Sequence, residues 1–64
     1  MEQDKERYIK AELLLRNNYY SNITSIYTMD NSIIYTCEKN NQHFILEVYD
    51  DTTIKVIRQI YSKL

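Results

Sequence analysis

The residues best suited to covalent chemistry are a single cysteine, Cys37, and a single histidine, His43. A cysteine nucleophile needs a base such as histidine within hydrogen-bond distance. In the strands predicted below, side chains alternate between two faces, which directs Cys37 to the core and His43 to the opposite side. We therefore expect no nucleophilic pair, and expect Cys37 to pack as a small apolar residue.

Two other groupings of polar residues could do chemistry. Glu38 and His43 are predicted to be direct cross-strand neighbours, but two ligands do not make a metal site, and one Cys with one His cannot build a four-ligand zinc centre. The paired carboxylates Asp50 and Asp51 are typical of a turn or a helix cap. General acid-base catalysis would also need a cleft, which nothing in the sequence indicates. We expect no metal.

The sequence contains no glycine. Phosphate-binding loops of the Walker A type and the dinucleotide fingerprint need glycine for close backbone approach or positive φ, so both are excluded. We expect no cofactor, no small-molecule substrate and no enzymatic activity.

Length and charge suggest a small soluble protein. The chain has 64 residues, with 8 Lys plus Arg, 9 Asp plus Glu and a formal net charge of −1. We predict one domain over 1–64, with 1–3 loosely held. A chain of this size buries only about 60% of its unfolded surface, so a stability of a few kcal/mol is expected without a partner. The start does not have the form of a signal peptide and no apolar run reaches membrane-spanning length, so we expect a cytoplasmic protein.

Residues 4–18 show the periodicity of an amphipathic helix. Asp4 is a suitable N-cap, and Asn17 with Asn18 is predicted to end the helix in a left-handed conformation. The apolar stripe expected to face the core comprises Tyr8, Ala11, Leu15 and Tyr19, widened by Ile9 and Leu13.

From residue 22 the chain becomes rich in β-branched and aromatic residues, interrupted by Asp30-Asn31, Asn40-Asn41 and Asp50-Asp51. The first two pairs suit two-residue hairpin turns, which predicts a meander of strands at about 23–29, 32–39 and 42–49. A turn at 40–41 fixes the register between the last two strands. The predicted cross-strand pairs are Cys37 with Phe44, Tyr35 with Leu46, and Ile33 with Val48.

This register divides the strands into two faces. The better core face is predicted to hold Thr24, Ile26, Thr28, Ile33, Tyr35, Cys37, Phe44, Leu46 and Val48. The other face is less polar than a solvated sheet face should be. There Tyr27 is expected opposite Ile34, Ser25 opposite Thr36, and Thr36 opposite Ile45.

Residues 52–64 fit two structures. The β-branched run from Thr52 to Ile57 would suit a fourth strand. Helical spacing fits the longer stretch better, since Ile54, Ile57, Tyr61 and Leu64 repeat at intervals of three and four. We predict an α+β fold with an N-terminal helix, a three-stranded antiparallel β-meander and a C-terminal helix in two layers. A four-stranded meander after one helix is the alternative.

The mixed second face is the predicted functional surface. Apolar and tyrosine-rich patches with few central charges suit protein contacts. We expect a non-enzymatic protein-binding module, as a homodimer, a stoichiometric inhibitor of a host protein, or both. The predicted partner-binding residues are Ile23, Tyr27, Met29, Ile34, Thr36, Ile45 and Tyr49.

A second function fits the cations near the end of the chain. Lys55, Arg58 and Lys63 would lie along the exposed side of the predicted last helix, where they could contact phosphates. This predicts a small DNA- or RNA-binding regulator. The net charge of −1 disfavours it relative to protein binding.

The composition is that of an AT-rich coding sequence, with many Ile, Tyr, Asn and Lys residues and no Gly or Pro. In size, composition and expected α+β architecture, the chain resembles the small inhibitors that phages and mobile elements encode against host enzymes, including anti-CRISPR and other anti-defence proteins. The resemblance implies a host protein as partner. It assigns no role to individual residues.

Overall fold

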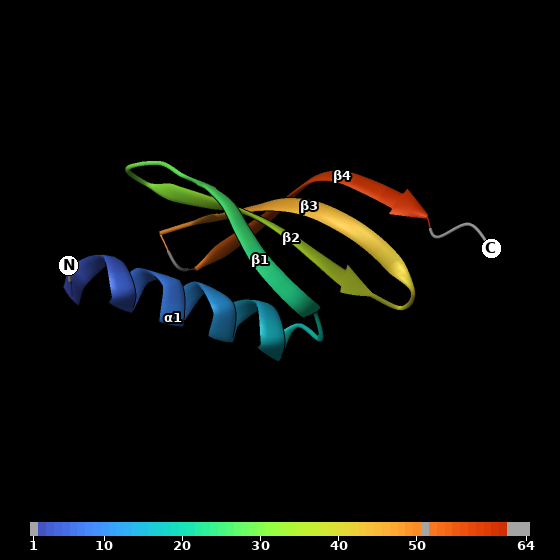
Figure 1. Cartoon of the computed structure of the whole chain (residues 1–64), viewed down its shortest axis with the longest axis horizontal. Coiled ribbons are helices and arrows are strands. Elements are labelled where there is room, and N and C mark those ends of the chain that lie inside the picture. Colours follow the sequence, from blue (N-terminus) through green and yellow to red (C-terminus); the bar gives the residue numbers. More distant parts are fainter. Residues whose placement is uncertain (1, 51, 62–64) are drawn as a thin grey trace.

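The computed structural model describes residues 2–50 and 52–61. One helix is followed by four strands: α1 (Glu2–Asn17), β1 (Ser21–Thr28), β2 (Ser32–Lys39), β3 (Gln42–Tyr49) and β4 (Thr53–Tyr61). The strands form one antiparallel sheet in the order β1-β2-β3-β4, with α1 against one face (Figure 1). The α+β prediction is confirmed in its four-stranded form. Within the described part of the chain, no helix has the length and hydropathy needed to cross a membrane.

Helix α1 packs on the sheet through a narrow stripe. Ala11 and Leu15 are fully buried, and Tyr8 packs beside them, as predicted. Ile9 and Leu13, which were expected to widen the stripe, are instead about half exposed, at 52% and 53%. The helix begins at Glu2, and Met1 lies outside the described residues.

The end of α1 differs from the prediction by one or two residues. Tyr19, rather than Asn17 or Asn18, takes the left-handed conformation, with φ 71°. Its amide donates to the carbonyl of Arg16, and the amide of Tyr20 donates to that of Leu15. This pair of bonds is a Schellman motif, which usually has glycine at the left-handed position. Tyr19 is 82% exposed there, so it does not join the core stripe.

The hairpin between β2 and β3 forms as predicted. Asn40 and Asn41 both have positive φ, of 55° and 64°, as a type I′ turn requires. The resulting register pairs Cys37 with Phe44, Tyr35 with Leu46, and Ile33 with Val48. The predicted core face on these two strands is therefore confirmed, since all six side chains are buried or pack against the buried cluster.

The predicted C-terminal helix is wrong over its described part, because residues 53–61 form β4. Val56 pairs with Leu46 while Arg58 pairs with Ile45, so Ile57 is an extra residue in the strand. Such a bulge places residues three apart on the same face, and this spacing imitates helical periodicity. The β-branched content was the correct signal. Residues 62–64 lie outside the described part.

The pairing of β1 with β2 differs from the predicted register, and this changes which β1 side chains lie on each face of the sheet. Tyr27 pairs with Ile34 as predicted, but Ser25 pairs with Tyr35 rather than with Thr36, because the register shifts between Ser25 and Tyr27. A second shift follows between Ser21 and Thr24, where Asn22 has φ 51°. Between the two shifts, the side chains of β1 therefore lie on the opposite face of the sheet from the one predicted. Turn spacing alone does not predict such bulges.

Several β1 residues change sides or lose their predicted burial as a result, and Ser25 now lies on the inner side opposite Tyr35. Ile23, expected among the partner-binding residues, packs against the core. Thr24 pairs with Thr36 on the opposite face, and Ile26 is exposed, although both were assigned to the core. Thr28 keeps its predicted side, where its hydroxyl hydrogen-bonds to that of Tyr8 on α1.

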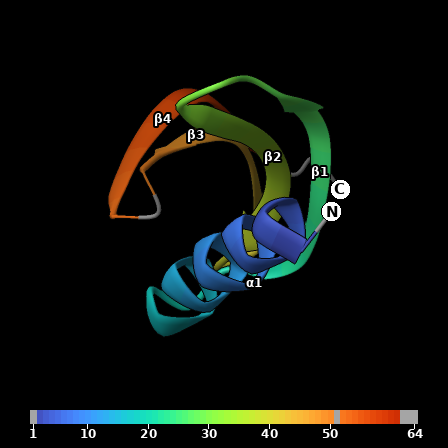
Figure 2. The ribbon, with the colours of Figure 1, turned by 90° about the vertical axis from the view of Figure 1, so that its left-hand side faces the viewer.

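The sheet curves around α1, so we call the side that holds the core the inner face and the opposite side the outer face (Figure 2). The buried cluster joins α1 to the inner face of β2 and β3 and comprises Ala11, Leu15, Ile33, Tyr35, Cys37, Leu46 and Val48. Beyond the end of α1, the rings of Tyr20 and Phe44 meet edge to face at 5.5 Å. Lys39 Nζ lies 4.9 Å from the centre of the Tyr20 ring.

Candidate functional site

The outer face carries a continuous patch of uncharged side chains. Ile34 and Thr36 on β2 alternate with the buried Ile33, Tyr35 and Cys37, so they point away from the core. Cross-strand pairing places Tyr27 beside Ile34, and Ile45 beside Thr36. Among the described residues no element covers this face (Figure 2). We call Tyr27, Ile34, Thr36 and Ile45 the outer patch.

The seven predicted partner-binding residues divide into two groups. The four residues of the outer patch and Tyr49 lie on the outer face, Tyr49 through its pairing with Ser32. Met29 follows β1 and belongs to the turn before β2, where its backbone amide donates to the Ser32 carbonyl. Ile23 packs against the core. The structure therefore brings five of the seven together.

Lys55 and Arg58, predicted as nucleic-acid contacts on a helix, lie on β4. Lys55 pairs with Glu47 and Arg58 pairs with Ile45, which places both on the outer face. The bulge at Ile57 is the reason, since two residues three apart in a regular strand would face opposite sides. Their positive charges thus border the outer patch. Lys63 lies outside the described residues.

Ile60 also belongs to this surface, although sequence reasoning did not select it. It pairs with His43 on the outer face and is 43% exposed. The strand alternative for residues 52–64 was the one signal that could have placed it there.

A polar network defines one side of the outer patch. Glu47 accepts hydrogen bonds from the buried Ser32 hydroxyl, at 2.6 Å to Oε2, and from the Tyr49 hydroxyl, at 2.7 Å to Oε1. These bonds, first from Ser32 and then from Tyr49, lower the pKa of Glu47, and the positive charge of Lys55 adds to the effect. The carboxylate in turn raises the pKa of Tyr49. Glu47 is therefore charged at neutral pH, and the Tyr49 ring is held in one orientation.

The pairing of Glu38 with His43 is confirmed. Their Oε2 and Nδ1 atoms are 3.6 Å apart, and both side chains are largely open to solvent. Among the described residues no group of three or more His, Cys, Asp or Glu side chains could hold a metal ion. This pair is thus a solvated ion pair when His43 is protonated, with a small energetic contribution.

Cys37 lies in the core, on the opposite face from His43. Burial raises the pKa of its thiol to about 11. Since the thiolate is the reactive form, the thiol is inert near neutral pH, and the two groups do not form a nucleophilic pair.

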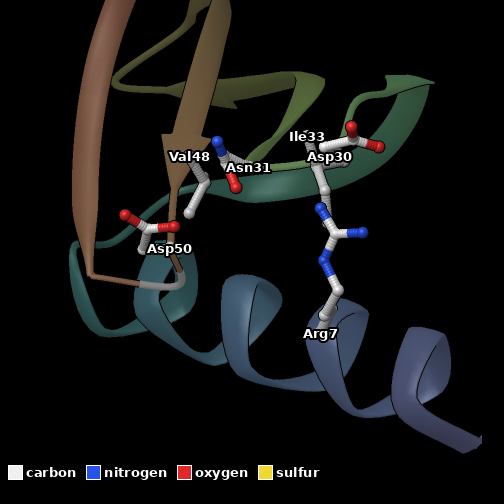
Figure 3. Close-up of a pocket in the computed structure, with 6 residues that line it drawn as sticks. All are labelled: Arg7, Asp30, Asn31, Ile33, Val48 and Asp50. Atoms are coloured by element: carbon white, nitrogen blue, oxygen red, sulfur yellow. The ribbon is translucent and has the colours of Figure 1, made fainter.

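The hollow under the β1–β2 turn was not predicted. It measures about 280 Å³ and is lined by Arg7, Asp30, Asn31, Ile33, Val48 and Asp50 (Figure 3). Arg7 reaches up from α1 and donates to the Met29 carbonyl at 2.7 Å. The Asp50 amide donates to the Asn31 carbonyl, which ties two turns together. The position of Arg7 one turn before Ala11 could have placed it toward the sheet, but only the tertiary fold identifies its acceptor.

These contacts make the hollow a structural feature. The Arg7 guanidinium donates to the Met29 carbonyl of the same chain, so Arg7 anchors α1 to the hairpin of β1 and β2. The outer patch, with its charged borders, is the better candidate for binding.

A scan against protein-family models and searches of the curated proteins and the solved structures find no match to this chain.

Proposed function

We propose that this protein is a non-enzymatic protein-binding module whose outer face covers a surface of its partner. The observation that carries the proposal is the outer patch. Two isoleucines and a tyrosine lie on neighbouring strands with no covering element among the described residues, and Tyr27 is 61% exposed. Aromatic and aliphatic side chains at the centre with charges at the border are typical of protein interfaces.

The protein would act by physically covering a surface of its partner, without chemical turnover. A bound partner would cover Ile34 and Ile45 while Lys55 and Arg58 contact its rim. The partner is a second copy of the chain, a host protein that the chain inhibits stoichiometrically, or both in turn. The resemblance to phage-encoded anti-defence inhibitors makes host defence enzymes the first class to test.

The test compares two double charge insertions. Ile34→Glu with Ile45→Glu places two charges in the outer patch, whereas Ile9→Glu with Tyr19→Glu places them at exposed positions on α1 and just after its end. Self-association is measured by sedimentation, and partner capture by quantitative mass spectrometry with each variant as bait. We expect the outer-face variant alone to lose the partner, by at least tenfold. Equal capture by both folded variants would contradict the proposal.

The positions of Lys55 and Arg58 favour a second candidate, binding of DNA or RNA. The two cations share one face with Tyr27, whose ring could stack on a base. Such binding would weaken steeply with salt and would be lost in Lys55→Glu with Arg58→Glu. Absence of retention on heparin or single-stranded DNA at low salt would remove this candidate.

A further inference from the structure

The two edges of the sheet differ in their capacity to accept another strand. Within the described residues, β1 and β4 each have one neighbour. β1 has two register irregularities in eight residues, and such bulges protect an edge from pairing. β4 has a single irregularity in nine residues. β4 is therefore the more regular template.

The inner side of β4 exposes apolar surface, next to the polar Gln59 that pairs with Phe44. Val56 pairs with the buried Leu46 on the inner face, yet it remains 46% exposed. A hollow of about 380 Å³ lies between α1 and the turn that precedes β4, lined by Lys10, Leu13, Leu14, Asn17, Asp50 and Thr52. A strand added beside β4 would cover Val56 and direct apolar side chains toward the half-exposed Leu13.

The outer side of β4 is cationic. Lys55 and Arg58 point outward, and β4 contains no acidic residue. Glu47 lies opposite Lys55, whereas Arg58 lies opposite the uncharged Ile45. Pairing with the β4 edge of a second copy would gather four cations along one seam, and like charges across strands are destabilising. Charge complementarity therefore selects an acidic partner segment.

We propose that the β4 edge accepts, as a fifth strand, an extended segment of a partner protein in which apolar and acidic residues alternate. Backbone hydrogen bonds to β4 supply affinity, and the alternating side chains supply selectivity. The apolar residues of the segment cover Val56, and its acidic residues contact Lys55 and Arg58. This inference rests on the proposed function in that the partner is a protein, and it names the chemistry of the segment that docks.

The test uses three capped eight-residue peptides with the wild-type protein. One alternates Val and Glu, a second alternates Val and Lys, and a third is the Val-Glu peptide N-methylated at alternate residues. Binding is followed by amide NMR shifts. We expect the Val-Glu peptide alone to shift residues 53–60. No shift along β4, or equal binding of any other peptide, would overturn the proposal.

A charge exchange strengthens the test. Lys55→Glu with Arg58→Glu should weaken the Val-Glu peptide at least tenfold and should favour the Val-Lys peptide. Unchanged preference in a folded variant would overturn the proposal. Should that variant not fold, the peptide comparison on the wild-type protein decides the question alone.

The edge and the outer patch can be separated. Ile34→Ala with Ile45→Ala should leave Val-Glu binding intact, because it adds no charge opposite Arg58 and neither residue lies on β4. If the Val-Glu peptide does not bind while the protein still captures its partner, only the edge proposal is overturned. If changing Ile34 and Ile45 does not reduce partner capture while the Val-Glu peptide still binds, only the outer-face proposal is overturned.

Discussion

Glu47 shows how single residues order the outer face. Its carboxylate accepts the Ser32 and Tyr49 hydroxyls at 2.6 and 2.7 Å, so one acidic group joins neighbouring strands and fixes an aromatic ring. Because these bonds favour the charged form, the folded pKa of Glu47 is lowered. Its contribution to stability is thus present above the unfolded pKa and is lost as pH falls through the folded pKa.

This network gives a prediction at the residue scale. Ser32→Ala should raise the pKa of Glu47 toward its ordinary value, and Tyr49→Phe should raise it less, because Ser32 is the larger cause. The measurement is an NMR titration of the Glu47 carboxyl carbon. Ser25→Ala, on the inner face, is the control and should leave the pKa unchanged. An identical Glu47 pKa in wild type and Ser32→Ala would refute the assigned cause.

At the scale of elements, the turn at Asn40 and Asn41 sets the register of the central hairpin. Both residues have positive φ, and glycine is favoured at the second position of a type I′ turn. Asn41→Gly should therefore stabilise the protein by about 0.5 kcal/mol in urea unfolding. Asn31 has no positive φ, so Asn31→Gly should cost about 0.5–1 kcal/mol. The same sign for both changes would contradict the turn assignment.

The central strands were predictable because local signals agree there. The turn residues, the β-branched content and the alternation all place Ile33, Tyr35 and Leu46 on one face, and the structure does the same. The two edge strands, β1 and β4, were not predictable in this way, because their bulges shift the register and no residue in this sequence signals a bulge. Bulges moved Ile23 to the core and placed Arg58 beside Lys55, so they also changed the composition of the candidate site.

At the scale of the whole molecule, stability depends on one small core beneath α1. Leu15 is fully buried while Leu13, two residues earlier, is 53% exposed. Leu15→Ala should lose about 2–5 kcal/mol, which is enough to unfold most of the protein, and Leu13→Ala should lose less than about 1 kcal/mol. Urea unfolding followed by circular dichroism measures both. Equal losses would contradict the described packing of α1.

Whole-molecule geometry also explains why the outer face is available for binding. The single described helix lies on the inner side of the curved sheet, so the outer side has no internal partner among the described residues (Figure 2). The aliphatic side chains of Ile34 and Ile45 are then placed where another protein can cover them.

Isoleucine methyl NMR tests this claim most directly, since the nine isoleucines sample every part of the fold: Ile9, Ile23, Ile26, Ile33, Ile34, Ile45, Ile54, Ile57 and Ile60. Spectra are compared for the free protein and for the protein bound to a second copy or to a captured partner. We predict that the Ile34 and Ile45 signals change on binding while that of Ile9, on α1, does not. A complex that forms with the Ile34 and Ile45 signals unchanged would contradict the account.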